Sequence, residues 1–220
     1  MLSISRRSAL VAFLSLVSLA PAARAGDSPL GDAVRHLQLA WERVKFETPE
    51  GADQTTAMNA LGDEADAVAA QFPDKVEALI WDGIVTSERA GMNGGFTALG
   101  LAKRARDILE RADKMDPDAL DAGAPTSLGV LYYRVPGFPI AFGDKRKARE
   151  LLESATRSAP NGLDAWYFYG DFLYGQGEYA AADAAFRHAL AIPKRPDRPL
   201  WDANRRLVIQ ERLDKLKDKT

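Results

Sequence analysis

The sequence predicts an all-α fold: an α-α superhelix of stacked helical hairpins, with inserted loops and a C-terminal capping helix. Three observations support this prediction. Apolar residues recur at helical spacing through most of the chain, and no stretch alternates with the period of a strand. A pattern of small and aromatic residues occurs three times, at intervals of roughly 40 residues. A proline follows each copy of the pattern, where a helix has to end.

The last copy, residues 163–196, shows the pattern most clearly. Two short helices that cross closely need small residues at the crossing, and large apolar side chains fill the space around it. Gly177 lets the chain turn between the helices, and Pro193 ends the second helix. The residues that carry the pattern are Trp166, Tyr169, Gly170, Tyr174, Gly177, Tyr179, Ala182, Phe186 and Ala189. Their types and spacings resemble those of a tetratricopeptide repeat.

Two further copies lie upstream, because a single hairpin cannot bury its apolar face alone. Residues 122–160 form one copy, in which Gly129 lies 41 residues before Gly170, against the 34 residues of an ordinary repeat. The extra seven residues fall between Tyr133 and Ala148. Residues 75–117 form the other copy, with an insertion of about 10 residues in the glycine-rich stretch around residues 91–96.

The remaining segments are predicted to complete the array at its two ends. Residues 29–73 have the pattern of a degenerate helical pair. Residues 198–217 form an amphipathic helix whose charged face is typical of the capping element that solenoids need for solubility.

The first 25 residues are expected to be a secretory signal peptide. Arg6 and Arg7 precede an apolar run, and Ala23 and Ala25 stand three and one positions before the expected cut. The mature chain would then be a single domain, residues 26–220, located in the periplasm, and no later stretch is long and apolar enough to span a membrane.

Composition excludes several classes of function. Removing the three arginines of the signal from a chain of formal charge −2 leaves a mature charge of −5, which favours neither nucleic acid nor an anionic membrane surface. The chain contains no cysteine, so disulfides, thiolate metal sites and cysteine nucleophiles are excluded. His36 and His188 lie near no acid, nucleophile or metal partner in a catalytic pattern. We therefore expect no catalytic residues, metal site or cofactor.

A longer resemblance runs from about Ala78 to Pro199. Its most specific part is the stretch from Leu128 to Asp144, LGVLYYRVPGFPIAFGD, followed by KARELL at residues 147–152. This sequence resembles the T-component family of TRAP transporters and is similar to the regulator of microtubule dynamics proteins. The resemblance implies an extracytoplasmic helical protein that associates with a periplasmic substrate-binding protein and carries an apolar ligand. The chain differs from the lipoproteins of that family because it has no cysteine to accept a lipid.

The candidate site is the concave face of the superhelix, which the first helix of each hairpin lines. The residues projected onto this groove are mainly apolar and aromatic, with a few polar groups, as in small-molecule sites. They are Ile80, Ile84, Thr126, Val130, Tyr133, Tyr167, Asp171 and Tyr174. The inserted loops are expected either to cover the groove as a lid or to collapse onto it as extra core. Their apolar residues are Phe96, Phe138, Ile140 and Phe142.

Two functions follow as hypotheses. The first is a binding protein or scaffold whose groove holds a hydrophobic small molecule or a protein partner, as an accessory component of a TRAP-type transporter. The second is a purely structural adaptor for protein assembly that binds no small ligand. An open pocket lined by tyrosines favours the first hypothesis, and a filled interior favours the second.

Overall fold

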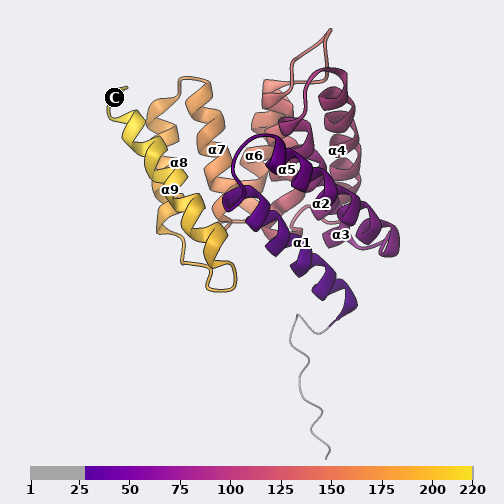
Figure 1. The fold of residues 1–220 in the computed structure, drawn as a ribbon. Helices are drawn as coiled ribbons and strands as arrows, with labels where there is room; N and C mark the ends of the chain where they lie inside the picture. The colour runs from indigo at the N-terminus through magenta and orange to yellow at the C-terminus, as the bar shows by residue number, and fades with distance from the viewer. Residues whose placement is uncertain (1–27, 220) are drawn as a thin grey trace, which may run out of the picture.

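The computed structural model describes residues 28–219, so the predicted signal peptide, residues 1–25, lies outside the described residues. The prediction of an all-α superhelix is confirmed for this part of the chain, which contains nine helices and, besides them, one isolated bridge between Gly137 and Gly143. Figure 1 shows the helices following one another across the molecule. They are α1 (Pro29–Phe46), α2 (Ala52–Gln71), α3 (Val76–Met92), α4 (Gly95–Met115), α5 (Ala119–Arg134), α6 (Lys145–Ser158), α7 (Leu163–Gly175), α8 (Tyr179–Ala191) and α9 (Pro199–Leu216).

Three of the hairpins depend on one glycine each, at the point where their two helices cross. A Cβ atom would lie 2.5 Å from Leu109 at Gly83, and 2.6 Å from Leu152 at Gly129. At Gly170 it would lie 2.6 Å from the ring of Phe186, a side chain that is completely buried. Because no Cβ fits, the absence of a side chain sets the distance between the helices of three successive hairpins.

The insertion near residues 91–96 differs from the expected loop. Helix α3 continues to Met92 and α4 begins at Gly95, so only two residues separate them. The extra residues lengthen both helices, to 17 residues in α3 and 21 in α4, compared with 13 each in α7 and α8. The stretch can remain helical because Ala90, Ala98 and Leu99 are good helix formers.

The second insertion, residues 135–144, is an irregular loop that projects from the end of the α5–α6 hairpin (Figure 1). Backbone hydrogen bonds fix its base: Gly143 N–H donates to Pro136 O and Asp144 N–H donates to Tyr132 O, both at 2.9 Å. The Asp144 carboxylate then accepts bonds from two backbone N–H groups in the first turn of α6. The loop therefore has an anchored base, although its tip extends into solvent.

The two ends of the array meet, which closes the superhelix into a ring formed by helices α1, α3, α5, α7 and α9. The Nε of Arg198 lies 2.6 Å from a carboxylate oxygen of Glu42 on α1; the Glu42 side chain is buried, and the Arg198 side chain is 11% exposed. The other oxygen of Glu42 accepts a bond of 3.3 Å from the backbone N–H of Trp201. Arg35 also donates to the backbone carbonyl of Asp197 at 3.1 Å. These contacts come from residues 193–212, which include most of α9, and we call these residues the closing segment.

Packing at the helix crossing is tested by Gly170→Ala, which should lower the free energy of unfolding by about 1–3 kcal/mol because the new methyl group overlaps Phe186. The matched control is Gly175→Ala on the same helix, where a Cβ atom meets nothing within 4 Å. That control should leave stability unchanged or raise it by up to about 1 kcal/mol. Urea unfolding measures both, and equal effects would contradict the assigned crossing.

Ring closure is tested by Arg198→Met, which leaves the buried Glu42 carboxylate without its counter-charge. We expect the free energy of unfolding to fall by about 3–5 kcal/mol, and the double variant Glu42→Leu/Arg198→Met to recover most of this loss. The control Arg187→Met removes an exposed ion pair with Asp183 and should cost less than about 1 kcal/mol. If Arg198→Met costs no more than this control, the ion pair does not hold the ring closed.

Candidate functional site

A cavity of about 380 Å³ lies inside the ring. Helices α1, α3, α4, α5 and α7 form its walls, and the closing segment covers it on the remaining side. At one end the cavity reaches Leu120 and Leu163, where α5 and α7 begin. At the other end it reaches Gly91 and Pro136, beside the tips of the α3–α4 and α5–α6 hairpins. It therefore follows the length of the inner helices.

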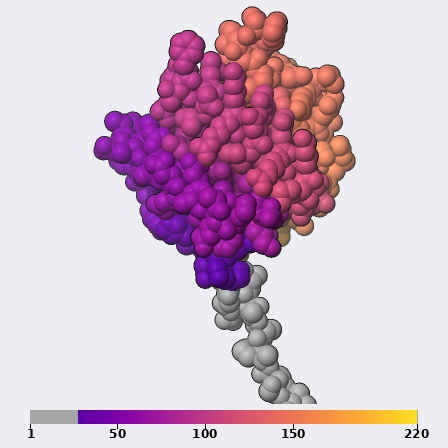
Figure 2. Space-filling model, turned by 90° about the vertical axis from the view of Figure 1, so that its right-hand side faces the viewer, coloured from indigo at the N-terminus to yellow at the C-terminus, as the bar shows by residue number. Residues whose placement is uncertain are grey.

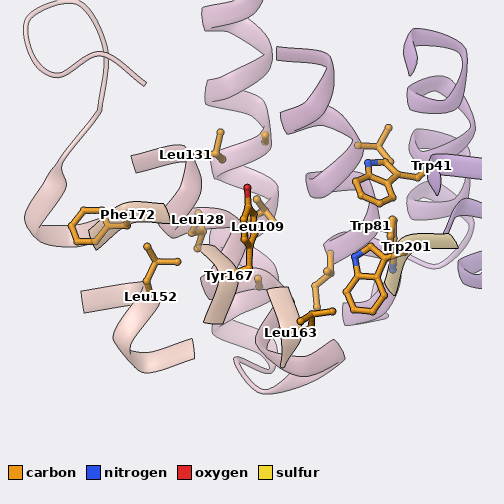
Figure 3. Close-up of a cluster of buried hydrophobic side chains, with 14 of the residues drawn as sticks. Trp41, Trp81, Leu109, Leu128, Leu131, Leu152, Leu163, Tyr167, Phe172 and Trp201 are labelled. Atoms are coloured by element: carbon orange, nitrogen blue, oxygen red, sulfur yellow. The ribbon is translucent and has the colours of Figure 1, made fainter. Parts of the chain in front are cut away.

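Three tryptophans form much of the cavity wall. Trp41 on α1 and Trp81 on α3 pack edge to face with ring centroids 6.1 Å apart, and Trp201 comes from the closing segment. The Arg198 guanidinium lies 5.5 Å from the ring centre of Trp81 and 4.6 Å from that of Trp201. Figure 3 shows the three tryptophans together at one side of the buried cluster. Large aromatic surfaces of this kind are suited to contact with an apolar molecule.

The eight predicted groove residues separate into two sets. Four of them line the cavity: Ile80, Ile84, Thr126 and Val130. The other four are absent from the cavity wall because they lie against α9 or in the contact between α5 and α7. These are Tyr133, Tyr167, Asp171 and Tyr174.

Helix α9 is held against α7 by a matched seven-residue spacing. Asp164 and Asp171 stand two turns apart on α7, and Arg205 and Arg212 stand two turns apart on α9. The Arg205 Nε lies 2.6 Å from Asp164, and an Arg212 nitrogen lies 2.8 Å from Asp171. Arg205 also stacks on Tyr167, 4.2 Å from its ring centre. The last repeat therefore presents its inner face to the chain's own C-terminal helix.

Tyr133 takes part in this contact network. Its hydroxyl donates a 2.6 Å hydrogen bond to Asp171, and its ring packs on Phe172 with centroids 5.7 Å apart. Burial, together with the neighbouring Asp171 carboxylate, raises the pKa of the Tyr133 hydroxyl. Arg134 donates to the same carboxylate at 3.2 Å. The hydroxyl of Tyr133 is thus occupied by a protein partner.

The four predicted lid residues do not line the cavity. Phe96 and Phe138 are 94% and 93% exposed, and Ile140 is 67% exposed. Phe142 instead packs edge-on against Tyr132, with ring centroids 5.4 Å apart. Figure 2 shows the two hairpin tips as separate knobs at the same end of the molecule, in magenta and orange. The apolar tips therefore flank the end of the cavity at Gly91 and Pro136 without covering it.

One end of the cavity contains a strained turn. Leu120, Asp121 and Ala122 have φ values of 52°, 56° and 58°, in the left-handed region where a side chain costs roughly 1–2 kcal/mol per residue. Ala122 is completely buried within a cluster of four alanines. Asp121 reaches across to Arg195 of the closing segment, at 3.0 Å. Such strain persists only where surrounding contacts impose it, and here the contacts join α5 to the closing segment.

Titratable groups elsewhere form no metal-binding cluster in the described residues. His36 contacts Glu64 at 2.8 Å, and His188 contacts the Pro160 carbonyl at 3.0 Å. None of the described helices has the length and apolarity needed to cross a membrane.

Asp82 is the buried acid with a pKa near neutrality. It is 4% exposed between α2, α3 and α4, accepts a 3.2 Å bond from Thr86, and faces Asp66 and Arg104. Burial first, and then the neighbouring Asp66 carboxylate, raise the pKa of Asp82 to about 6. Asp82 does not line the cavity, so its effect falls on stability.

The raised pKa of Asp82 predicts a specific pH dependence. The folded state binds this proton more tightly than the unfolded state, so the contribution of Asp82 to stability becomes less favourable as the pH rises from 4 to 7. Relative to Asp82→Asn, the parent protein should lose up to about 3 kcal/mol across this range. Urea unfolding of both proteins at pH 4.5, 6 and 7.5 tests this, and a constant difference between them would refute it.

Sequence reasoning missed Trp81 on α3 and the residues contributed by the two ends of the chain: Trp41, Glu42, Arg198 and Trp201. One signal was present, because three of the four tryptophans in the chain surround this cavity. Trp201 lies in the first turn of α9, whose outer face is charged. A tryptophan at such a position is expected to be buried against another element. The partner of that tryptophan depends on the curvature of the array, which the repeat pattern does not specify.

Comparisons with known proteins identify one repeat and a similar helical fold. Residues 163–195 match the tetratricopeptide repeat family model. The fold is similar to the crystal structure of TTC0263, a thermophilic tetratricopeptide-repeat protein of Thermus thermophilus. The TM-score is 0.55, the identity is 15%, and the alignment covers 85% of this chain and 91% of that one. A similarity to MamA has a TM-score of 0.45 at 17% identity, over 86% of this chain and 92% of that one. No curated protein matches the chain.

The repeat and the fold together indicate a role in protein binding or scaffolding. A solenoid with free ends has an open groove. The helices of this chain instead form a closed ring with a cavity at its centre.

Proposed function

We propose that this protein is an extracytoplasmic binding protein that holds a mostly apolar small molecule in the cavity of its closed helical ring. The observation that supports this function is the cavity itself. Its volume of about 380 Å³ lies in the range of small-molecule sites, about 300–1,000 Å³. Its wall combines tryptophan, isoleucine, valine and leucine side chains with polar and charged groups, and the apolar side chains supply the contact surface that such sites need.

The closing segment favours a small ligand over a peptide in the concave face. A peptide bound along the inner helices would need the surface of α7 that Arg205 and Arg212 already cover. Displacing α9 would also break the buried contact between Glu42 and Arg198. Breaking a buried ion pair costs several kcal/mol, which would reduce the affinity for any peptide accordingly.

The resemblance to TRAP transporter T components supports a second part of the proposal. The protein would act in the periplasm as an accessory component that exchanges its ligand with a substrate-binding protein. Such a partner would approach the end of the molecule that exposes Phe96, Phe138 and Ile140, because these side chains flank the cavity at Gly91 and Pro136. Exposed aromatic side chains of this kind are frequent in protein interfaces.

An assembly adaptor without a small ligand is the alternative function. The exposed hairpin tips favour it independently of the cavity, since Phe96 and Phe138 contact almost nothing in the folded chain. The two functions are distinguished by whether a molecule placed in the cavity is bound.

The ligand function is tested with the neutral fluorophore N-phenyl-1-naphthylamine, whose emission rises in an apolar site. We expect saturable binding with one molecule per chain, and Gly91→Phe should weaken it at least about fivefold by occupying the end of the cavity. The matched control is Gly100→Phe. Both glycines are helical, and a Cβ atom at either position would meet nothing within 4 Å, but only Gly91 lines the cavity.

Gly100→Phe should bind the fluorophore as the parent does. Equal affinities for the two variants, or no saturable binding by the parent, would overturn the ligand function and leave the adaptor. Thermal melts of both variants show whether each is folded, and we expect neither to be destabilised, because a helical glycine is replaced by a better helix former.

A further inference from the structure

The charged side chains around the cavity are all paired with opposite charges. Four arginines and three acids contribute to its wall, and each has an ionic partner within 4 Å in the described chain. This pairing bears on the chemical class of the ligand, an inference that rests on the proposed binding function.

Two of the pairs are largely withdrawn from water. Arg198 and Glu42 are 2.6 Å apart, and their side chains are 11% and 2% exposed. Arg205, with a side chain 11% exposed, lies 2.6 Å from Asp164. The carboxylate of Asp164 also accepts a 3.2 Å hydrogen bond from the Trp201 indole N–H. These arginines already share short contacts with a protein carboxylate.

The other charges form three groups nearer to solvent. Glu88 pairs with Lys45 at 2.8 Å. Arg195 lies between Asp121 and Asp197, at 3.0 and 3.1 Å, which leaves one carboxylate in excess.

Arg134 and Arg212 share Asp171 at 3.2 and 2.8 Å, which leaves one cation in excess. The excess negative charge beside Arg195 and the excess positive charge beside Arg134 lie near opposite ends of α5, and the Arg134 side chain is 53% exposed, so water screens its charge.

A charged ligand would therefore lose its hydration and gain only the excess charges beside Arg134 and Arg195, which lie nearer to solvent and are screened by water. Burying an ionised carboxylate or ammonium group is strongly unfavourable unless it is paired. A ligand carboxylate that paired with Arg198 or Arg205 would share a guanidinium that already contacts Glu42 or Asp164. The buried Nη2 of Arg198 makes no hydrogen bond within the described chain, and an uncharged oxygen of the ligand would satisfy it. An uncharged ligand avoids the cost of burying a charge.

Neutral polar groups remain available in the wall. The Gln38 amide and the Ser127 hydroxyl line the cavity, both residues are partly exposed, and neither side chain has a hydrogen-bond partner in the part of the chain that the structure describes. An amide and a hydroxyl each donate and accept hydrogen bonds. They suit a hydroxyl, carbonyl or amide on the ligand.

We infer that the ligand is an electrically neutral, mostly apolar molecule with an uncharged polar group, such as an alcohol, ketone or amide. The paired charges around the cavity exclude organic acids and amines by desolvation, and Gln38 and Ser127 bind the uncharged polar group.

The test compares four ten-carbon probes of the same chain length at pH 7.5: 1-decanol, decanamide, decanoate and decylammonium. Each competes with N-phenyl-1-naphthylamine on the full mature chain. We expect 1-decanol and decanamide to displace the fluorophore at concentrations at least about tenfold below those of the two ions, a difference of about 1.4 kcal/mol. Decanamide separates the effect of charge from that of polarity, because it is polar and uncharged.

Variants add a second readout. Gln38→Leu/Ser127→Ala should weaken decanamide binding at least about threefold while leaving binding of the fluorophore, whose contacts are mainly apolar, within twofold. Arg134→Gln should change the affinities for decanoate and decanamide by the same factor, because the charge of Arg134 contributes little to either.

Decanoate or decylammonium binding as tightly as decanamide would overturn the inference and leave the ligand function in place. Loss of decanoate affinity in Arg134→Gln, with decanoate the tightest probe, would identify an anion site instead. Failure of the fluorophore and all four probes to bind would overturn the ligand function itself.

Discussion

The buried contact between Glu42 and Arg198 joins residues 156 positions apart and holds the two ends of the array together. A solenoid whose repeats contact only their neighbours has free ends and an open groove. Here the C-terminal segment crosses the groove and places a guanidinium between Trp81 and Trp201, beside a carboxylate that is 1% exposed. A buried pair stabilises only when both partners remain in place, so the ends of this ring are held together as one unit.

Closure changes what the concave face can bind. The inner surface of the last repeat contacts α9 through Asp164 and Asp171, and the aromatic residues there stack with Arg205 and Arg212. What remains accessible is the cavity beside α1, α3 and α5, whose ionic groups already have partners. Under the proposed function, the same contacts that close the ring would limit the ligand to a small molecule and favour an uncharged one.

The hairpin tips lie outside the cavity and are candidates for contact with a protein partner. Phe96 and Phe138 stand at the ends of two anchored hairpins and lie almost entirely in solvent. They flank the cavity at one end of the molecule, as Figure 2 shows for the two knobs. A ligand in the cavity and a protein partner at the tips are therefore compatible, and both proposals agree with the binding and scaffold roles that the repeat fold indicates.

The sequence by itself determined the all-α class, the helical hairpins and the crossing glycines Gly129 and Gly170, because close packing within a hairpin acts between residues near each other in the chain. It also indicated four cavity residues on α3 and α5: Ile80, Ile84, Thr126 and Val130. Only the tertiary structure decided that Tyr167 and Tyr174 lie under α9, that Phe96 lies on a helix instead of a lid, and that Trp41 and Trp201 complete the cavity. The physical reason is that small rotations between successive hairpins add up along the array. Whether its two ends meet depends on that sum, which no single repeat encodes.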